Sequence, residues 1–151
     1  DPDRDIPPLE EQLNDVWSAW KTDLTEFRES GGKLIVYHGW TDPMLSPYNT
    51  LQYRKELAQT MGEDALPDFY RLYMAPGMDH CGGGVGPSRF DALGALVNWV
   101  EEGEAPMTLV ASGVTAEGEP RTRLLCNYPQ VAVYDGEGDP DSVDSYSCGS
   151  Q

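Results

Sequence analysis

Two apolar runs, each followed by a loop and then by an amphipathic helix pattern, limit most strongly what this chain can fold into. The first run, KLIVYHG at 33–39, precedes a helix pattern at 48–62, and the second, DFYRLYMA at 68–75, precedes one at 88–103. Near-continuous apolar runs of this length are typical of strands buried on both faces, as in parallel sheets. The repeated order of strand, loop and helix therefore predicts an α/β fold with a mostly parallel sheet.

The segments on either side of this unit are less regular. Residues 9–20 space their apolar side chains as an amphipathic helix does, and a short helix is expected over 22–30, capped by Thr22. Beyond Pro106, three stretches read as short strands or as extended tail segments: 107–112, 121–126 and 130–136. The Gly-, Asp- and Ser-rich end, 135–150, is expected to be a loop.

The net charge of the chain limits the classes of molecule that it can bind. Its 151 residues carry 10 Lys and Arg against 26 Asp and Glu, a formal net charge of −16. Such a surface repels phosphate backbones and anionic lipids, which argues against nucleic-acid and membrane partners. No apolar run reaches the length of a membrane span, and the acidic N-terminus does not read as a signal peptide. A solubilising surface accounts for the charge without any specific role.

Asp42 and His80 each follow one of the two predicted strands. The carboxyl ends of parallel strands meet at one edge of a sheet, where ligands bind in open α/β folds. An Asp beside a His is the supporting half of a hydrolytic triad, in which the His moves the proton of the nucleophile and the Asp orients the imidazole. The order of acid before His is that of α/β-hydrolases. The alternatives are turn chemistry at Asp42-Pro43 and a purely structural His80.

The other histidine and the serines complete the inventory of possible catalytic groups. His38 ends its strand beside Gly39 and is expected to be a buried, hydrogen-bonded residue that shapes the Asp42 loop. The chain has no G-x-S-x-G motif, the strand-to-helix turn that presents the serine of α/β-hydrolases. Two other serines lie beside prolines and a third follows the histidine in the chain: Ser46, Ser88 and Ser112. We therefore expect the nucleophile to lie outside residues 1–151.

The three cysteines, Cys81, Cys126 and Cys148, show no metal-binding spacing, so no metal site is expected. An odd number leaves one thiol either free or paired outside the chain. Cys126 and Cys148 would close a loop over the Gly- and Asp-rich tail, and we expect them to form a disulfide; two unrelated thiols are the alternative. A disulfide implies an oxidising compartment, so the protein is expected to be secreted or periplasmic.

Four stretches together closely resemble the C-terminal part of the tannase and feruloyl esterase family. They are GGKLIVYHGWTDPMLSP, FYRLYMAPGMDHCGGGVGP, NWVEEGEAP and RTRLLCNYPQVAVYDG, and the resemblance covers most of residues 23–148. It implies an α/β-hydrolase with a serine esterase mechanism. The acid of the family's H-G-x-x-D motif maps to Asp42, and the histidine of its H-C pair maps to His80.

The resemblance also implies a partner for Cys81. In the family, the cysteine after the catalytic histidine forms a disulfide with a cysteine just before the nucleophilic serine. The family's G-C-S-x-G-G elbow, its oxyanion-hole loop and most of its lid are absent from this sequence. We therefore expect residues 1–20 to be the end of the lid region and 21–151 the C-terminal part of the catalytic domain. Cys81 would then join an N-terminal chain of the same enzyme.

The same resemblance implies esters of phenolic or aromatic acids, such as galloyl or feruloyl esters, as substrates. Trp40, Met44 and Leu45 could offer apolar contact to the acyl group, or they could be loop residues packed under the lid. The resemblance implies no cofactor for the chemistry and allows a calcium ion in the lid. Two other readings stay open: a non-enzymatic α/β fragment or binding module, and the same scaffold acting on a different scissile bond.

Overall fold

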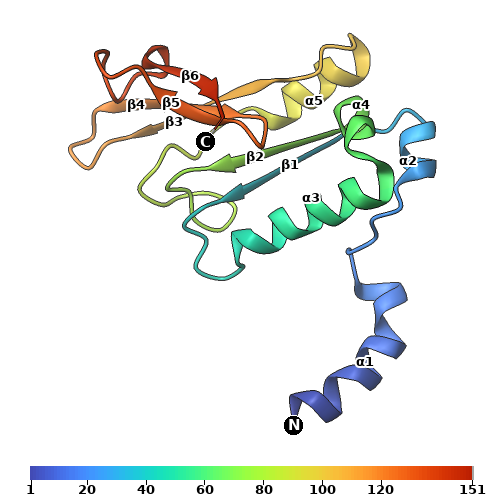
Figure 1. Ribbon diagram of the computed structural model, residues 1–151. Helices are drawn as coiled ribbons and strands as arrows, with labels where there is room; N and C mark the ends of the chain where they lie inside the picture. The colour runs from blue at the N-terminus through green and yellow to red at the C-terminus, as the bar shows by residue number, and fades with distance from the viewer. Residues whose placement is uncertain (151) are drawn as a thin grey trace.

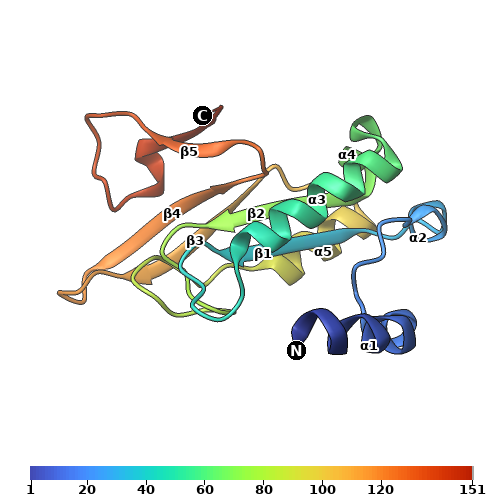
Figure 2. The same cartoon turned by 60° about the horizontal axis from the view of Figure 1, so that its bottom comes forward.

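The computed structural model describes residues 1–150, except for the side chain of Asp15. Two parallel strands lie at its centre: β1 (Leu34–Gly39) and β2 (Tyr70–Ala75). Helices α3 (Pro47–Met61) and α5 (Ala92–Glu101) cover the opposite faces of this pair, with α3 in front and α5 behind in Figure 2. This is the strand–helix–strand–helix unit expected from the sequence, and it includes both predicted strands.

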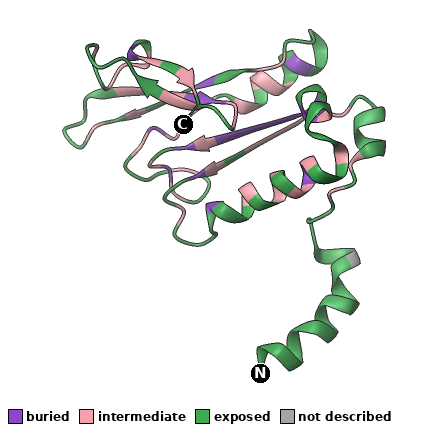
Figure 3. Ribbon diagram, in the orientation of Figure 1, coloured by how far each residue is buried: buried purple, intermediate pink, exposed green. Residues whose placement is uncertain are grey.

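The register of the parallel pair places the ends of both strands side by side. Leu34 lies opposite Tyr70 at one end, and Gly39 lies opposite Ala75 at the other. β2 is the more buried strand, with five of its six residues buried, as the purple ribbon in Figure 3 shows. The loops that follow the two strands therefore start from neighbouring points.

Beyond the parallel pair, the chain forms two antiparallel pairs. β3 (Thr108–Val114) pairs with β4 (Pro120–Cys126), and β5 (Val131–Tyr134) pairs with β6 (Tyr146–Gly149). The expected mostly parallel sheet is thus present among the described residues only as the β1–β2 pair. Short connections allow neighbouring strands to pair antiparallel, whereas parallel pairing needs a long crossover.

The expectation of a loop over 135–150 was wrong for its last part. A 3₁₀ turn at Val143–Ser145 leads into β6, and the carboxyl end of the chain folds back on β5. The three stretches after Pro106 that read as strands or extended segments are strands β3, β4 and β5. β6 could not be predicted from composition, because it contains no run of apolar side chains. Its hydrogen bonds to β5 and the Cys126–Cys148 disulfide hold it in place.

The segment between β4 and β5 is hydrogen-bonded to β2, which holds the C-terminal strands against the parallel pair. The N–H of Tyr128 donates to the carbonyl of Leu72 at 2.8 Å, and the N–H of Leu72 donates to Asn127 Oδ1 at 3.1 Å. One buried cluster spans β2, β3 and β4: Tyr73, Ala75, Met78, Leu109, Ala111 and Leu125. A second cluster packs α3 and its C-terminal neighbours onto β2: Leu57, Leu66, Phe69, Tyr70 and Leu72.

Two element boundaries differ from the sequence prediction around the second unit. The strand expected at 68–75 begins at Tyr70, because a 3₁₀ turn (η1, Glu63–Ala65) and a short helix (α4, Leu66–Phe69) come first. Pro67 in the first turn of α4 suits a helix start, where its missing N–H costs nothing.

The helix expected at 88–103 is shorter, because residues before it are extended. Arg89 forms a β-bridge with Ser112, which rules out helical backbone there. Asp91 caps α5 in place of Ser88, and its Oδ1 accepts from the N–H of Gly94 at 2.7 Å.

The N-terminal helices also differ from expectation. Helix α1 spans Pro2–Trp17, not 9–20, because Asp1 caps it by accepting from the N–H of Asp3 at 3.1 Å. Helix α2 is limited to Thr25–Glu29, and Thr22 does not cap it. Figure 1 shows α1 standing away from the rest of the chain, and its apolar side chains at Val16 and Trp17 are 81% and 79% exposed. No helix of residues 1–150 is long and apolar enough to cross a membrane.

The Cys126–Cys148 disulfide expected from the sequence is present, with the two Cα atoms 5.7 Å apart. It joins the end of β4 to β6 across 22 positions, and the chain-entropy argument assigns such a loop about 3 kcal/mol. We expect the double variant Cys126→Ala/Cys148→Ala to lower the free energy of unfolding by about this amount in denaturant titrations. A loss below about 0.5 kcal/mol would show that the tail adds nothing to global stability.

Candidate active site

The loops after β1 and β2 are tied together directly beyond the strand ends. The N–H of Trp40 donates to the carbonyl of Ala75 at 3.0 Å. Both the N–H and the hydroxyl of Thr41 donate to the carbonyl of Met78, at 3.1 and 2.8 Å. These bonds hold the Asp42 loop against the segment that leads to His80.

Gly39 is required by this close approach. A Cβ built on Gly39 would lie 2.0 Å from the carbonyl oxygen of Met78, which is backbone and cannot move aside cheaply. The glycine of the H-G pair therefore lets the two strand ends and their loops meet.

The carboxylate of Asp42 is held from two sides. Its Oδ1 accepts from the N–H groups of Met44 and Leu45, at 2.8 and 2.9 Å. Its Oδ2 lies 2.8 Å from His80 Nδ1 and 3.0 Å from His38 Nε2, and the side chain is only 2% exposed. Burial by itself would raise the pKa of Asp42, but the backbone hydrogen bonds and the one with His80 outweigh it and hold the pKa well below its usual value.

The His80 loop is built from conformations that few residues adopt. Cys81 has a φ of 59°, and the three glycines after it also have positive φ. A Cβ on Gly84 would lie 2.2 Å from the carbonyl oxygen of Gly77, so the loop folds tightly back on its own start. This explains why three glycines follow the H-C pair, and it presents an imidazole that is 37% exposed.

The pair can act as the proton-handling half of a triad. Because ionised Asp42 can only accept, the contact requires His80 Nδ1 to carry a proton, which leaves Nε2 of the neutral ring basic. The carboxylate orients the ring and stabilises the imidazolium when Nε2 takes a proton. The expected Asp42–His80 contact is therefore present at the common edge of the two strands, and the catalytic roles of these residues stay predictions.

His38 is hydrogen-bonded beside the Asp42 loop, as expected, but it is half-buried and not fully buried. Its side chain is 13% exposed, and both of its ring nitrogens are within hydrogen-bond reach of other side chains. The sequence did not point to Thr50, whose hydroxyl lies 2.6 Å from His38 Nδ1. That contact depends on how α3 packs on β1, which no local pattern encodes.

None of the hydrogen bonds of residues 1–150 joins a serine to His80. The hydroxyl of Ser88 accepts from the N–H of Gly83 at 3.1 Å, and that of Ser112 donates to the carbonyl of Arg89 at 3.2 Å. Ser46 is the residue before the first turn of α3. Ser88 and Ser112 therefore hydrogen-bond within their own neighbourhood, and the source of the nucleophile stays a prediction.

Of the three residues expected to contact the substrate, Trp40 alone lines a groove described for residues 1–150. Met44 and Leu45 project from the loop, with exposed fractions of 73% and 54%. Trp40 packs edge-on against Tyr48, with 5.9 Å between ring centroids, and lines an open groove of about 1120 Å³. No contact here tests a role in substrate binding, which stays a prediction.

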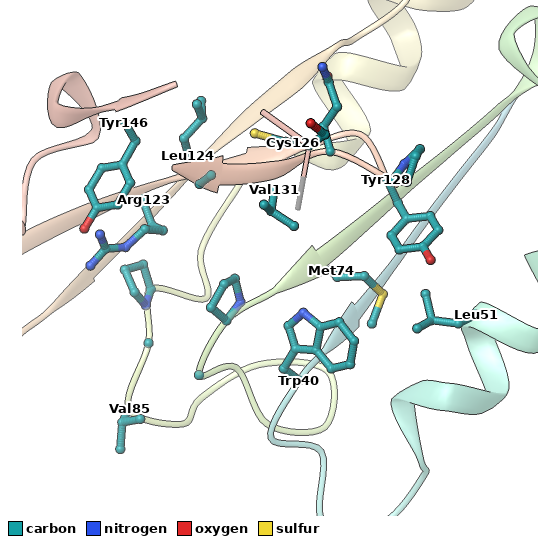
Figure 4. Close-up of a pocket in the computed structure, with 18 of the residues that line it drawn as sticks. Trp40, Leu51, Met74, Val85, Arg123, Leu124, Cys126, Tyr128, Val131 and Tyr146 are labelled. Atoms are coloured by element: carbon teal, nitrogen blue, oxygen red, sulfur yellow. The ribbon is translucent and has the colours of Figure 1, made fainter. Parts of the chain in front are cut away.

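This groove is lined both by residues of the parallel pair and its loops and by residues of the C-terminal strands. In Figure 4, Trp40 and Met74 lie on one side of it, and Arg123 and Tyr146 on the other. The guanidinium of Arg123 lies over the ring of Tyr146, 4.3 Å from its centroid. The groove could not be predicted from the sequence, because its two walls come from segments far apart in the chain.

Cys81 is exposed and forms no disulfide within residues 1–150. Cys81 comes directly after His80 in the loop that follows β2. In the same part of the chain, no group of three or more His, Cys, Asp or Glu side chains is placed to hold a metal ion.

A family model described as "Tannase and feruloyl esterase" matches residues 5–149. The chain belongs to this family. The match includes the segments that carry Asp42, His80 and Cys81, and it confirms the resemblance read from the motifs.

Similar proteins point the same way. The chain is 42% identical to the mono(2-hydroxyethyl) terephthalate hydrolase of Piscinibacter sakaiensis, over 97% of this chain and 26% of that protein. It is 40% identical to a probable feruloyl esterase of Arthroderma benhamiae, over 95% of this chain and 28% of that protein. The chain thus spans little more than a quarter of the length of these relatives.

A solved structure supports the fold. The crystal structure of feruloyl esterase B from Aspergillus oryzae matches with a TM-score of 0.78 and 32% identity, covering 86% of this chain and 29% of that one. This likeness is consistent with an α/β-hydrolase-type fold, of which the β1–β2 pair and its two helices are a part.

Proposed function

We propose that this chain is the C-terminal part of a serine-type carboxylic ester hydrolase. The observation that carries the proposal is the 2.8 Å contact between His80 Nδ1 and the buried carboxylate of Asp42, at the carboxyl ends of two parallel strands. In this proposal residues 1–20 end the lid, and 21–151 complete the catalytic domain. An N-terminal chain supplies the serine, the oxyanion hole and most of the lid.

The proposed reaction follows from the protonation of the pair. His80 Nε2 removes the hydroxyl proton of the serine as that oxygen attacks the ester carbonyl, and it then gives the proton to the departing alcohol. Water repeats the cycle on the acyl-enzyme and releases the acid. Asp42 stays ionised throughout, which its lowered pKa favours, and the imidazolium forms beside a fixed negative charge. The chemistry needs no cofactor.

We further propose that the acyl group is a phenolic or aromatic acid. The names of two relatives, a probable feruloyl esterase and a terephthalate monoester hydrolase, support this class. The Cys126–Cys148 disulfide supports an oxidising, secreted or periplasmic location.

The substrate class is tested on the assembled enzyme with esters of one alcohol. We expect kcat/KM for methyl ferulate or methyl gallate to exceed that for methyl butyrate by about 10- to 100-fold, because burying an aromatic ring adds roughly 1.5–3 kcal/mol of binding. Using methyl esters throughout keeps the leaving group constant. Equal or better hydrolysis of the butyrate would contradict the aromatic acyl group but leave the esterase mechanism standing.

A further inference from the structure

Two imidazoles converge on a single oxygen of Asp42. His80 Nδ1 lies 2.8 Å from Oδ2, and His38 Nε2 lies 3.0 Å from the same atom. The proposed mechanism uses only the first of these contacts. The second comes from the end of β1, where the His38 side chain is 13% exposed.

The proton positions on His38 follow from its partners. An ionised carboxylate offers only acceptors, and so does the carbonyl oxygen of Leu45, which lies 3.3 Å from the same Nε2. Nε2 must therefore carry a proton. In neutral imidazole Nδ1 is then an acceptor, and the hydroxyl of Thr50, 2.6 Å away, can donate to it. A threonine in the first turns of α3 thus selects the tautomer of a histidine at the end of β1.

We propose that His38 is a positioning residue for the triad: through its Nε2–H it holds Asp42 Oδ2 at His80 Nδ1, and Thr50 keeps His38 in the tautomer that can do so. This inference rests on the proposed esterase function. Both ring nitrogens of His38 are engaged, so it is not available as a second base. It acts only through Asp42.

The geometry shows why a donor is needed at this point. The backbone N–H groups of Met44 and Leu45 hold Oδ1, but they leave the carboxylate free to tilt about that anchored end. The bond from His38 fixes the other oxygen. Removing it would leave a nearly buried oxygen with one partner fewer, and a tilt would relieve that loss while weakening the contact with His80. Small displacements of a catalytic group are costly because the reaction requires aligned partners.

The test uses the assembled enzyme and compares kcat with KM. We expect His38→Leu, which removes the donor, to lower kcat about 10- to 100-fold with KM changed less than about 2-fold, since His38 lies behind the carboxylate. His38→Gln places an amide N–H near the position of Nε2 and should recover most of the lost kcat. Thr50→Val removes the hydroxyl at equal size and should lower kcat several-fold, whereas Thr50→Ser keeps the hydroxyl and should match the wild type.

Several results would overturn the positioning role. One is wild-type kcat in His38→Leu, and another is no recovery in His38→Gln relative to Leu. If His38→Leu fails to fold, the Thr50 pair decides, and equal kcat in the Val and Ser variants counts against the proposal. His80→Ala, measured alongside, separates the two hypotheses. If His80→Ala is inactive while the His38 and Thr50 variants are fully active, only the positioning role fails. An active His80→Ala would overturn the esterase assignment itself.

Discussion

Replacing His80 by alanine is expected to lower kcat of the assembled enzyme by about 10⁴-fold or more. The His80 imidazole contacts the Asp42 carboxylate and is 37% exposed. His38 is 13% exposed, and both of its ring nitrogens are within hydrogen-bond reach of other side chains. Without His80, the Asp42 carboxylate of the described residues would have no exposed imidazole beside it to take the serine proton, and binding and the oxyanion hole would be left to accelerate the reaction. Steady-state hydrolysis of a phenolic ester measures the effect.

Asp42→Asn should be nearly as severe, about 10³- to 10⁴-fold in kcat, although it changes almost no volume. The two backbone N–H groups that bind Oδ1 would keep the amide oxygen on their side, which turns the amide NH₂ toward His80. His80 Nδ1 would then have to accept, so its proton would move to Nε2 and the ring could not act as base.

The matched control for Asp42→Asn is Asp64→Asn, the same chemical change in the exposed 3₁₀ turn η1. We expect it to have wild-type kcat. Turnover within about 10-fold of wild type in His80→Ala or Asp42→Asn would contradict the catalytic assignment, provided that both variants keep the thermal unfolding of the control.

The contact between Asp42 and His80 could be predicted because it follows from one long-range rule. Two apolar runs that each precede a helix form parallel strands, and parallel strands in register end at the same edge. The loops that follow them then start from neighbouring points, which favours contact between Asp42 and His80. The family resemblance indicated that Asp42 and His80 are the catalytic acid and histidine. It was also the only indication of a partner for Cys81.

Features that depend on packing between distant segments were not predictable. The place of Thr50 beside His38 depends on the rotation of α3 about its axis, and β6 forms because β5 offers it an edge. The cap of α5 shows the same limit locally. Ser88 and Asp91 are both favourable cap residues. Arg89 forms a β-bridge with Ser112, which no short-range pattern predicts, so the helix begins after Asp91 and not after Ser88.

Cys81 is expected to form a disulfide with a cysteine outside residues 1–151. Cys81 is exposed and follows His80 directly, on a backbone with φ of 59°. A bond from this position to a cysteine beside the serine would tie base and nucleophile together covalently. We expect reduction of the purified enzyme to release a second polypeptide on a denaturing gel, or, if both cysteines belong to one polypeptide, a cross-linked pair of peptides in a tryptic map made without reduction.

Cys81→Ser gives the functional test of the same bond, because serine keeps the size and the backbone demand of cysteine while removing the sulfur. We expect it to lower the free energy of unfolding by about 2–4 kcal/mol and to make kcat fall on mild heating. Where the two cysteines belong to separate chains, kcat should also fall on dilution, because the chains then separate. Cys126→Ala/Cys148→Ala is the matched control: it removes a disulfide within the tail and should destabilise the fold without separating the serine from His80. Quantitative alkylation of Cys81 without prior reduction, together with esterase activity in the 151-residue chain alone, would overturn both the covalent link and the assignment of the nucleophile to another segment.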